Sequence, residues 1–343
     1  MTDPTTAGGG TINTVNTVNT VNTVLGPVSA DDLGVVAVHE ALLSVVPGAE
    51  YAFDVTMDRV EIFETLARKL TDFREQGGAT IVDSTGMFHG RDVPLYEVLS
   101  RSTGVHIVAS TGMGPEEMLG GYFLTPQTNP PTPWPADKFA DLFAQEVVEG
   151  MVVPRVERRG AAGLVATAAS PEGMTATEES LFRGAARTAL TTGVPVSIRH
   201  GKNAVHDLEV VLDEHLSADR VVVGGLDRLD AVAAGEPLKI AGRGAFVALD
   251  HVGLEDAAHV TDSERAGLVL ELVRAGHADR IILSSNAIGV AKGHAEGDPT
   301  PDLSFGHVLS AFVPLLRSHG VSDEDLQRIL VENPRALLTI SQR

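Results

Sequence analysis

The chain has no cysteine and few aromatic residues. The absence of cysteine among its 343 residues excludes disulfide bonds, thiolate nucleophiles and cysteine-ligated metal sites. Aromatic residues make up 4% of the sequence, and the formal net charge is −20. Nucleic acids and anionic membrane surfaces are bound through clustered cations, and single strands also through aromatic stacking. We therefore expect neither a nucleic-acid nor a membrane partner.

Long apolar segments and nucleotide-binding motifs are also missing. No apolar run approaches the roughly 20 residues of a membrane-spanning helix. The N-terminus lacks the basic and apolar regions of a secretory signal peptide, so we expect a cytoplasmic protein. No Gly-x-Gly-x-x-Gly or Walker motif follows an apolar run, which argues against a bound nucleotide.

Residues 1–24 have low complexity. A run of glycines is followed by a repeat of threonine, valine and asparagine with a period of three. This period fits the burial pattern of neither a helix nor a strand, and the segment is too short for a solenoid. We predict a flexible arm over residues 1–24, a turn at Gly26-Pro27 and a single domain over residues 25–343.

Short apolar runs alternate with amphipathic stretches along the rest of the chain. This alternation predicts an α/β fold in which parallel strands are joined by crossover helices, and eight runs favour a closed (β/α)8 TIM barrel. The predicted strands are residues 34–39, 80–84, 105–110, 163–169, 195–200, 220–224, 245–250 and 280–285. The predicted helices are residues 59–75, 137–149, 176–191, 205–215, 226–234, 263–275 and 305–318.

The first apolar run, VVAVHEA, ends in His39 and Glu40. In an α/β barrel, polar residues at the C-terminal ends of the strands form the site. Two long loops, residues 112–135 and 289–304, leave the same ends and are expected to cover a binding pocket. His39 is therefore the first candidate for a functional residue.

Longer segments of the chain are distinctive. They read NTVLGPVSADDLGVVAVHE at residues 22–40, GGATIVDST at 77–85, GRDV at 90–93, VHIVASTG at 105–112, TGVPVSIR at 192–199, ADRIILSSN at 278–286 and FVPLLRSHGVSDEDLQRILVENPRALL at 312–338. Together they resemble the phosphotriesterase family of the amidohydrolase superfamily over nearly all of residues 22–338. The resemblance implies an amidohydrolase-like TIM barrel. It also implies two divalent metals at the mouth, which activate water to hydrolyse phosphotriesters, lactones or related esters.

The sequence departs from this family at the metal ligands. The family uses a His-x-His pair on the first strand, a lysine on the fourth, histidines ending the fifth and sixth, and an aspartate ending the eighth. His39 matches the first histidine. A divalent metal needs about three or four protein donors, so we predict no bound metal, no cofactor and no metal-dependent hydrolysis. The other ligand positions are held by Ala41, Ala166, Arg199, Gly225 and Asn286.

Polar residues remain at the predicted strand ends. An arginine buried at a barrel mouth needs a carboxylate or an anion. Arg199 either pairs with Asp83, Asp227 or Asp250, or binds a small anionic ligand. The catalytic candidates are His39, Asp250 and His251. The ligand-binding candidates are His39, Arg199, His200, Asp250, His251 and Asn286.

Three functions fit these residues. The first is a pseudoenzyme that binds a small molecule without turnover, alone or beside an active relative. The second is a metal-independent enzyme that performs proton transfer, elimination or cyclisation with His39, Asp250, His251 and Arg199. The third is a residual metal-dependent hydrolase of esters, lactones or phosphotriesters. We favour the first because a fold survives the loss of site residues more readily than chemistry does. The sequence leaves open a homodimer or a hetero-oligomer with an active homologue.

Overall fold

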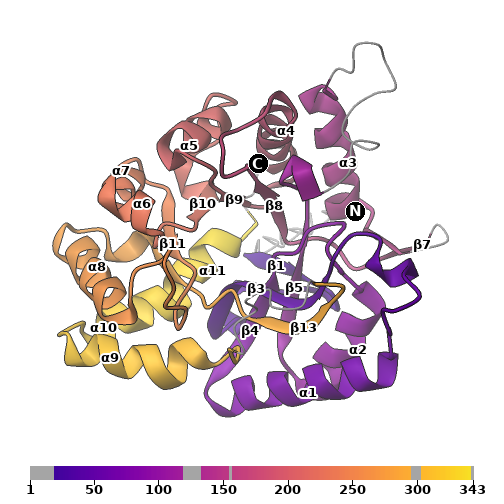
Figure 1. Cartoon of the computed structure of the whole chain (residues 1–343), viewed down its shortest axis with the longest axis horizontal. Helices are drawn as coiled ribbons and strands as arrows, with labels where there is room; N and C mark the ends of the chain where they lie inside the picture. The colour runs from indigo at the N-terminus through magenta and orange to yellow at the C-terminus, as the bar shows by residue number, and fades with distance from the viewer. Residues whose placement is uncertain (1–18, 119–132, 154–156, 295–302, 341–343) are drawn as a thin grey trace, which may run out of the picture.

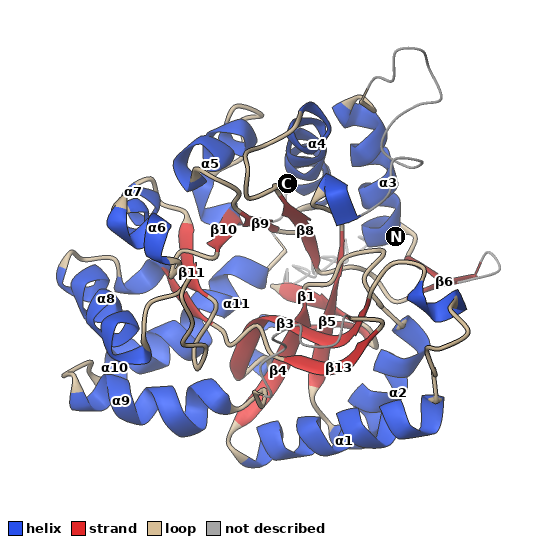
Figure 2. Cartoon of the chain, in the orientation of Figure 1, coloured by secondary structure: helices blue, strands red, loops and turns tan. Residues whose placement is uncertain are grey.

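The computed structural model describes residues 19–118, 133–153, 157–294 and 303–340, and its core is a (β/α)8 barrel. Parallel strands neighbour one another in chain order around the sheet, with helices outside them (Figures 1 and 2). They are β3 (Val35–Val45), β4 (Gly78–Asp83), β5 (His106–Thr111), β8 (Leu164–Ala168), β9 (Val196–Arg199), β10 (Val221–Gly224), β11 (Phe246–Leu249) and β12 (Ile281–Leu283). Strand β13 (Ile288–Lys292) follows β12 and pairs with β3, which brings the two ends of the sheet together.

The predicted strands and helices are confirmed in the described ranges, with boundaries that shift by a few residues. The helices are α1 (Arg59–Glu75), α2 (Val93–Thr103), α3 (Ala136–Val148), α4 (Ala176–Thr192), α5 (Ala204–Leu212), α6 (Leu229–Ala233), α7 (Glu236–Gly242), α8 (Asp262–Arg274), α9 (Val313–Ser318), α10 (Asp323–Gln327) and α11 (Asn333–Leu338). Helices α2, α7 and α11 lie outside the segments that we predicted to be helical. All three carry a proline in the first turn, where its missing N–H costs nothing and its fixed φ suits a helix.

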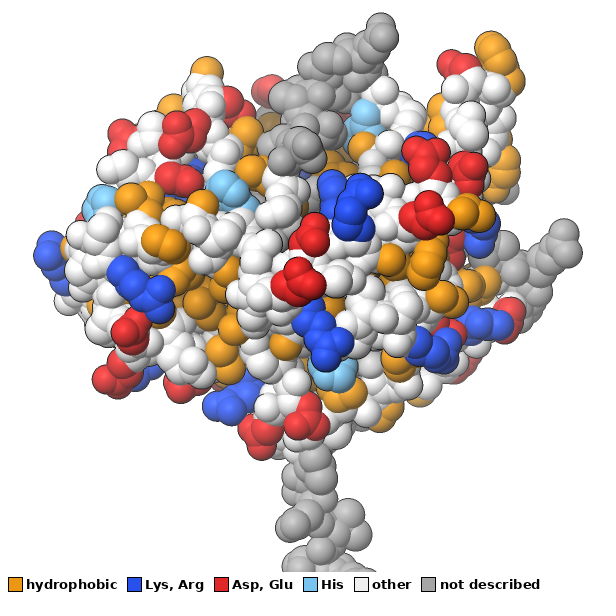
Figure 3. Space-filling view, turned by 90° about the horizontal axis from the view of Figure 1, so that it is seen from below, with side chains coloured by type: hydrophobic (Ala, Val, Ile, Leu, Met, Phe, Trp, Pro, Cys, Tyr) orange, Lys and Arg blue, Asp and Glu red, His pale blue; other side chains and the backbone are white. Residues whose placement is uncertain are grey.

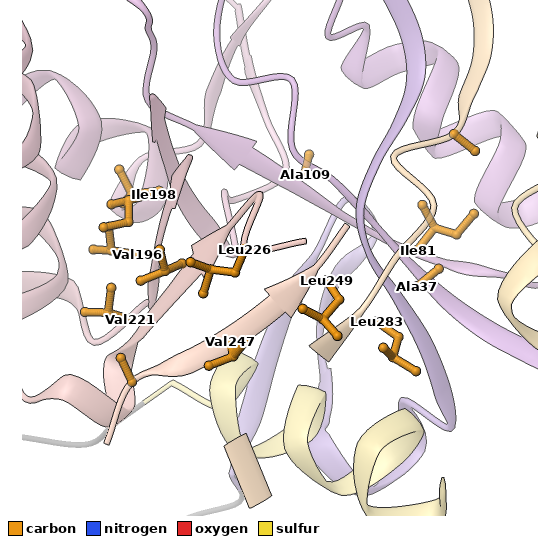
Figure 4. Packing of buried hydrophobic residues seen from close by; sticks show 14 of the residues in the cluster. Ala37, Ile81, Ala109, Val196, Ile198, Val221, Leu226, Val247, Leu249 and Leu283 are labelled. Carbon is orange, nitrogen blue, oxygen red and sulfur yellow. The ribbon is translucent and has the colours of Figure 1, made fainter. Parts of the chain in front are cut away.

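Each strand packs two different faces because side chains alternate along it. Val247 and Leu249 of β11 join the large cluster between the sheet and the helices (Figure 4). Phe246 and Ala248 of the same strand join a second cluster inside the barrel, where they meet Val222 of β10. Apolar side chains therefore fill the inside of the barrel below the mouth, and the polar residues lie at the C-terminal ends of the strands.

The N-terminal boundary of the domain needs correction. Strand β1 (Thr20–Thr23) lies in the segment that we predicted to be a flexible arm, and it pairs with β2 (Gly26–Ser29) in an antiparallel hairpin. The turn between them is at Val24 and Leu25, not at Gly26-Pro27 as predicted. Val21 is buried in the cluster inside the barrel, and the N–H of Val24 donates to the carbonyl of Ile107 on β5. The repeat places Val21 on the inward face of a short strand, and burial of that side chain fixes the segment. Residues 1–18 lie outside the described ranges.

Two short hairpin strands, β6 (Met151–Val153) and β7 (Glu157–Arg159), lie outside the barrel sheet. Acidic and basic side chains are mixed with apolar ones over the face drawn in Figure 3. Among the described helices, none is long and apolar enough to cross a membrane.

The hairpin yields a stability prediction. We expect Val21→Ala to lower the free energy of unfolding by about 1–3 kcal/mol, because it removes buried methyl groups and leaves a cavity inside the barrel. Urea unfolding would measure this change. The matched control is Val148→Ala, at an exposed position at the end of α3, which should stay within about 0.5 kcal/mol of the original protein. Equal effects of the two substitutions would show that the hairpin is not part of the core.

Candidate functional site

A chain of hydrogen bonds crosses the mouth of the barrel between three strands. His39 on β3 lies between Ser197 on β9 and Asp250 after β11. The Ser197 Oγ lies 2.7 Å from His39 Nε2, and His39 Nδ1 lies 2.8 Å from Asp250 Oδ1. All three residues are slightly accessible, with exposed fractions of 6% for Ser197, 8% for His39 and 6% for Asp250. These three hydrogen-bonded side chains are thus mostly shielded from bulk water, and each keeps a small accessible surface at the mouth.

A local irregularity of β3 aims the imidazole across the barrel. The pairing of β3 with β4 shifts register between Ala37 and Glu40, and His39 has a φ of 62°. A left-handed φ is costly for a residue with a side chain, so the surrounding structure has to hold it. The hydrogen bonds to Ser197 and Asp250 are the interactions that do so.

The second oxygen of Asp250 is also fixed. Asp250 Oδ2 accepts the backbone N–H of Gly225 at 2.8 Å. The resemblance aligns Gly225 with a metal-binding histidine of the family, and in this structure Gly225 contributes its backbone N–H to Asp250. The adjacent Gly224 has to be glycine, because a Cβ there would lie 2.5 Å from Asp250 Oδ2.

The protonation of His39 is biased by these contacts. Burial disfavours the imidazolium, but the negative charge of Asp250 and its hydrogen bond outweigh burial and raise the pKa of His39. A histidine with a carboxylate on one nitrogen and a hydroxyl on the other is arranged to exchange a proton with the hydroxyl side.

The side chain of Glu40, the residue after His39, links β3 to the segment that follows β12. Its carboxylate accepts hydrogen bonds from the Ser284 hydroxyl at 3.0 Å and from the N–H groups of Ser285 and Ala287 after β12. Burial raises the pKa of Glu40 to about 7, although these donors favour the charged form. Glu40 therefore has a structural role at the closure of the barrel.

Arg199 lies two residues after Ser197 on β9, so both side chains are on the same face of the strand. Its side chain is exposed, close to the charges of Asp250, Arg228 and Glu117. Among the residues that the structure describes, none forms a hydrogen bond or an ion pair with the Arg199 guanidinium.

The three carboxylates considered as partners of Arg199 are engaged elsewhere. Asp83 accepts hydrogen bonds from the Leu42 N–H and the Tyr96 hydroxyl. Asp227 binds the side chain of Arg265, and Asp250 binds His39. The predicted structural ion pair of Arg199 with one of these aspartates is therefore wrong.

His251 belongs to a separate pair. We expected Asp250 and His251 to act together, but the imidazole Nδ1 of His251 binds Asp227 Oδ1 at 2.7 Å. The buried Arg265 donates to the other oxygen of Asp227 at 2.8 Å. Burial opposes the charge of Asp227, but the hydrogen bond from His251 and the charge of Arg265 lower its pKa well below the usual range. The His251 ring stacks on His259, with centroids 4.0 Å apart.

The last two candidates lie apart from the hydrogen-bonded chain. His200 is buried, and its ring nitrogens approach the carbonyl oxygens of Gly201 and Gly225 at 3.0 and 3.1 Å. It links the loops after β9 and β10, as expected for a side chain turned away from Arg199. Asn286 is exposed after β12 and has a left-handed φ of 48°.

The residues present do not fit the metals of the family. Within the described ranges, no group of three or more His, Asp or Glu residues is placed to hold a metal ion. Both ring nitrogens of His39 are already hydrogen-bonded, which leaves no lone pair free for a metal. Alanine at positions 41 and 166 supplies no donor, and a guanidinium at position 199 repels a cation.

The sequence analysis missed Ser197 and the roles of Glu40 and Asp227. The signal for Ser197 was the strand alternation in VSIR, which places Ser197 and Arg199 on one face. No sequence pattern brings these residues beside His39, because that contact spans 158 positions along the chain.

In the (β/α)8 barrels that are enzymes, polar side chains at the C-terminal ends of the strands form the active site. The phosphotriesterase family matches residues 19–338, and the chain belongs to this family. The resemblance stated from the sequence is therefore confirmed.

Curated relatives cover nearly the whole chain. An aryldialkylphosphatase from Saccharolobus solfataricus is 27% identical over 319 residues, which covers 90% of this chain and 96% of that protein. A phosphotriesterase homology protein from Mycobacterium tuberculosis is 26% identical over 321 residues, which covers 91% and 95%. An N-acetyltaurine hydrolase from Salmo salar is 25% identical over 359 residues, which covers 92% and 97%.

The same fold occurs among solved structures. A structure reported under "Molecular Engineering of Organophosphate Hydrolysis Activity from a Weak Promiscuous Lactonase Template" superposes with a TM-score of 0.82 at 24% identity, over 93% of this chain and 99% of that one. This likeness supports the fold.

The replaced ligands yield a prediction about metal content. We expect the protein purified without chelator to contain no stoichiometric zinc, manganese or iron at the mouth, because His39 has no free lone pair and the neighbouring positions lack donors. Elemental analysis before and after incubation with zinc and desalting would measure this. A stoichiometric metal that survives desalting would contradict the prediction.

Glu40 yields a prediction about pH. Its pKa rises from 4.5 to about 7 on folding, so the folded state keeps a proton that the unfolded chain loses between these values. The contribution of Glu40 to stability is therefore greatest below the unfolded pKa and falls as the pH rises towards the folded pKa. We expect the unfolding free energy of the original protein, minus that of Glu40→Gln, to fall by about 1–3 kcal/mol across this window. Urea unfolding at a series of pH values measures the difference, and a constant difference would refute the assignment.

Proposed function

We propose that the mouth of this barrel binds a small anionic molecule, a carboxylate or a phosphate, through Arg199 and without a resident metal. The observation that carries the proposal is the exposed Arg199 guanidinium, which has no hydrogen-bond or ion-pair partner among the described residues. A guanidinium presents parallel N–H donors that match the two oxygens of a carboxylate or phosphate.

The net negative charge of the protein strengthens the case for Arg199 as the anion-binding group. With a formal net charge of −20, the average field of the protein repels anions. An anionic ligand would therefore need a positive group at the site itself. Arg228 lies near Arg199 but is paired with Asp230 at 2.5 Å. Arg199 is the better candidate for the direct contact.

A second candidate function, metal-independent catalysis, is favoured by the chain of hydrogen bonds from Ser197 through His39 to Asp250. A binding protein without turnover and an enzyme would share the binding step at Arg199, and only the enzyme would then convert the bound molecule. The relatives include an aryldialkylphosphatase and an N-acetyltaurine hydrolase, and those activities are properties of the relatives. If the protein binds without turnover, we propose that it can do so as a homodimer or in a hetero-oligomer with an active relative.

The test compares Arg199→Met with Arg243→Met. We expect Arg199→Met to weaken binding of small carboxylates or inorganic phosphate by about 10- to 100-fold, because a charge-assisted hydrogen bond is lost. Arg243 follows α7 and is paired with Glu209 on α5, so its substitution removes the same charge away from the mouth and should leave binding unchanged. Isothermal titration calorimetry with acetate, succinate, citrate and phosphate measures the dissociation constants of the original protein and of the two variants.

Two outcomes would contradict this proposal. One is a folded Arg199→Met variant with the binding profile of the original protein. The other is the absence of saturable binding of every ligand in the panel to the original protein.

A further inference from the structure

The residues that cross the mouth form a Ser–His–Asp arrangement where the family places its metals. We propose that Ser197 is the nucleophile of a metal-independent esterase site, with His39 as its general base and Asp250 orienting His39. The substrate class is a short carboxylic ester whose acyl part carries an anionic group. The choice of substrate rests on the proposed function, because it assigns that anionic group to Arg199.

The distances fit this chemistry. A serine becomes a nucleophile when a base lies within about 2.6–3.2 Å and a third group orients that base. Ser197 Oγ lies 2.7 Å from His39 Nε2, and His39 Nδ1 lies 2.8 Å from Asp250 Oδ1. The Gly225 N–H holds the remaining oxygen of Asp250. Every member of the arrangement is therefore fixed by its neighbours.

The hydrogen bonds also select the tautomer. A carboxylate accepts hydrogen bonds, so His39 Nδ1 carries the hydrogen that faces Asp250. In neutral His39 this leaves a lone pair on Nε2, which accepts the Ser197 hydroxyl hydrogen. This is the tautomer that a serine nucleophile requires.

Two of the residues around Ser197 at the mouth have small side chains. In the pairing of β8 with β9, Ser197 lies beside Ala166, and both residues keep a small exposed surface. Ala166 stands where the family has its lysine, so a methyl group replaces a long side chain next to the hydroxyl. Ala41, across the mouth on β3, is likewise small and slightly exposed. Alanine side chains therefore stand near Ser197 at two positions where the resemblance places metal ligands.

Arg199 sets the charge of the substrate. Two residues along a strand are separated by about 6.6 Å, and the side chains at both positions share one face. An acyl group with its carbonyl at Ser197 can therefore present an anionic group to Arg199. A monoester of a short dicarboxylic acid has this form.

The reaction needs only the ester and water. Ser197 Oγ bonds to the carbonyl carbon while its proton passes to His39 Nε2. The bond from carbon to the alcohol oxygen then breaks, and the alcohol leaves with that proton. A water molecule attacks the acyl group on Ser197, again giving a proton to His39. The bond to Ser197 breaks, the serine recovers the proton, and the carboxylic acid leaves.

The first experiment uses a fluorophosphonate probe on the full-length protein. Its phosphorus bonds to an activated serine with loss of fluoride, and peptide mapping by mass spectrometry identifies the modified residue. We expect labelling at Ser197 in the original protein and at least a 10-fold loss in Ser197→Ala. The matched control is Ser285→Ala, a buried hydroxyl at a strand end with no hydrogen-bond partner in the described ranges, which should label normally. An unlabelled Ser197 in the original protein overturns the proposal, whether or not the variants fold.

The second experiment separates this proposal from the proposed function. The 4-nitrophenyl monoester of succinic acid is compared with 4-nitrophenyl acetate in the original protein, Arg199→Met and Ser197→Ala. We expect Ser197→Ala to abolish turnover of both esters, and Arg199→Met to raise KM about 10-fold for the succinate ester alone. Anion binding at Arg199 without labelling or turnover at Ser197 refutes the esterase and leaves the binding function intact. If labelling and turnover are the same in Arg199→Met as in the original protein, Ser197 is supported as the nucleophile and the anionic substrate is refuted.

Discussion

Buried carboxylates at the strand ends have to be satisfied by hydrogen bonds, and the mouth of the barrel is built around this constraint. Glu40 takes N–H groups from the segment after β12, and Asp83 takes the N–H of Leu42. Asp250 and Asp227 take N–H groups from Gly225 and His251, each across neighbouring strands. An unpaired buried carboxylate costs several kcal/mol, so these bonds tie each strand end to its neighbour.

The same constraint explains how contacts within the protein hold the mouth together. Here the imidazole of His39 faces Asp250, and the guanidinium of Arg265 faces Asp227. The polar network is thus satisfied from within the protein. Arg199 lies outside this buried network: its side chain is exposed, and no partner of its guanidinium is found among the described residues.

Much of the fold could be predicted from the sequence because strands that are buried on both faces appear in it as continuous apolar runs. The runs indicated the order of the barrel strands. The failures had local causes. Helices α2 and α7 begin with a proline in the first turn, and the hairpin around Val21 is hidden in a repeat whose period matches no regular element.

The sequence by itself determined the family and the barrel, because each depends on which residue type stands at a given position. It also marked His39, Arg199 and Asp250 as residues of the mouth. Only the tertiary structure decided which of them touch. It joined Asp250 to His39 rather than to His251, brought in Ser197 and left Arg199 without a carboxylate. Such contacts join residues more than a hundred positions apart across a closed barrel, and strand curvature and the bulge at His39 set them. No local pattern in the sequence encodes that geometry.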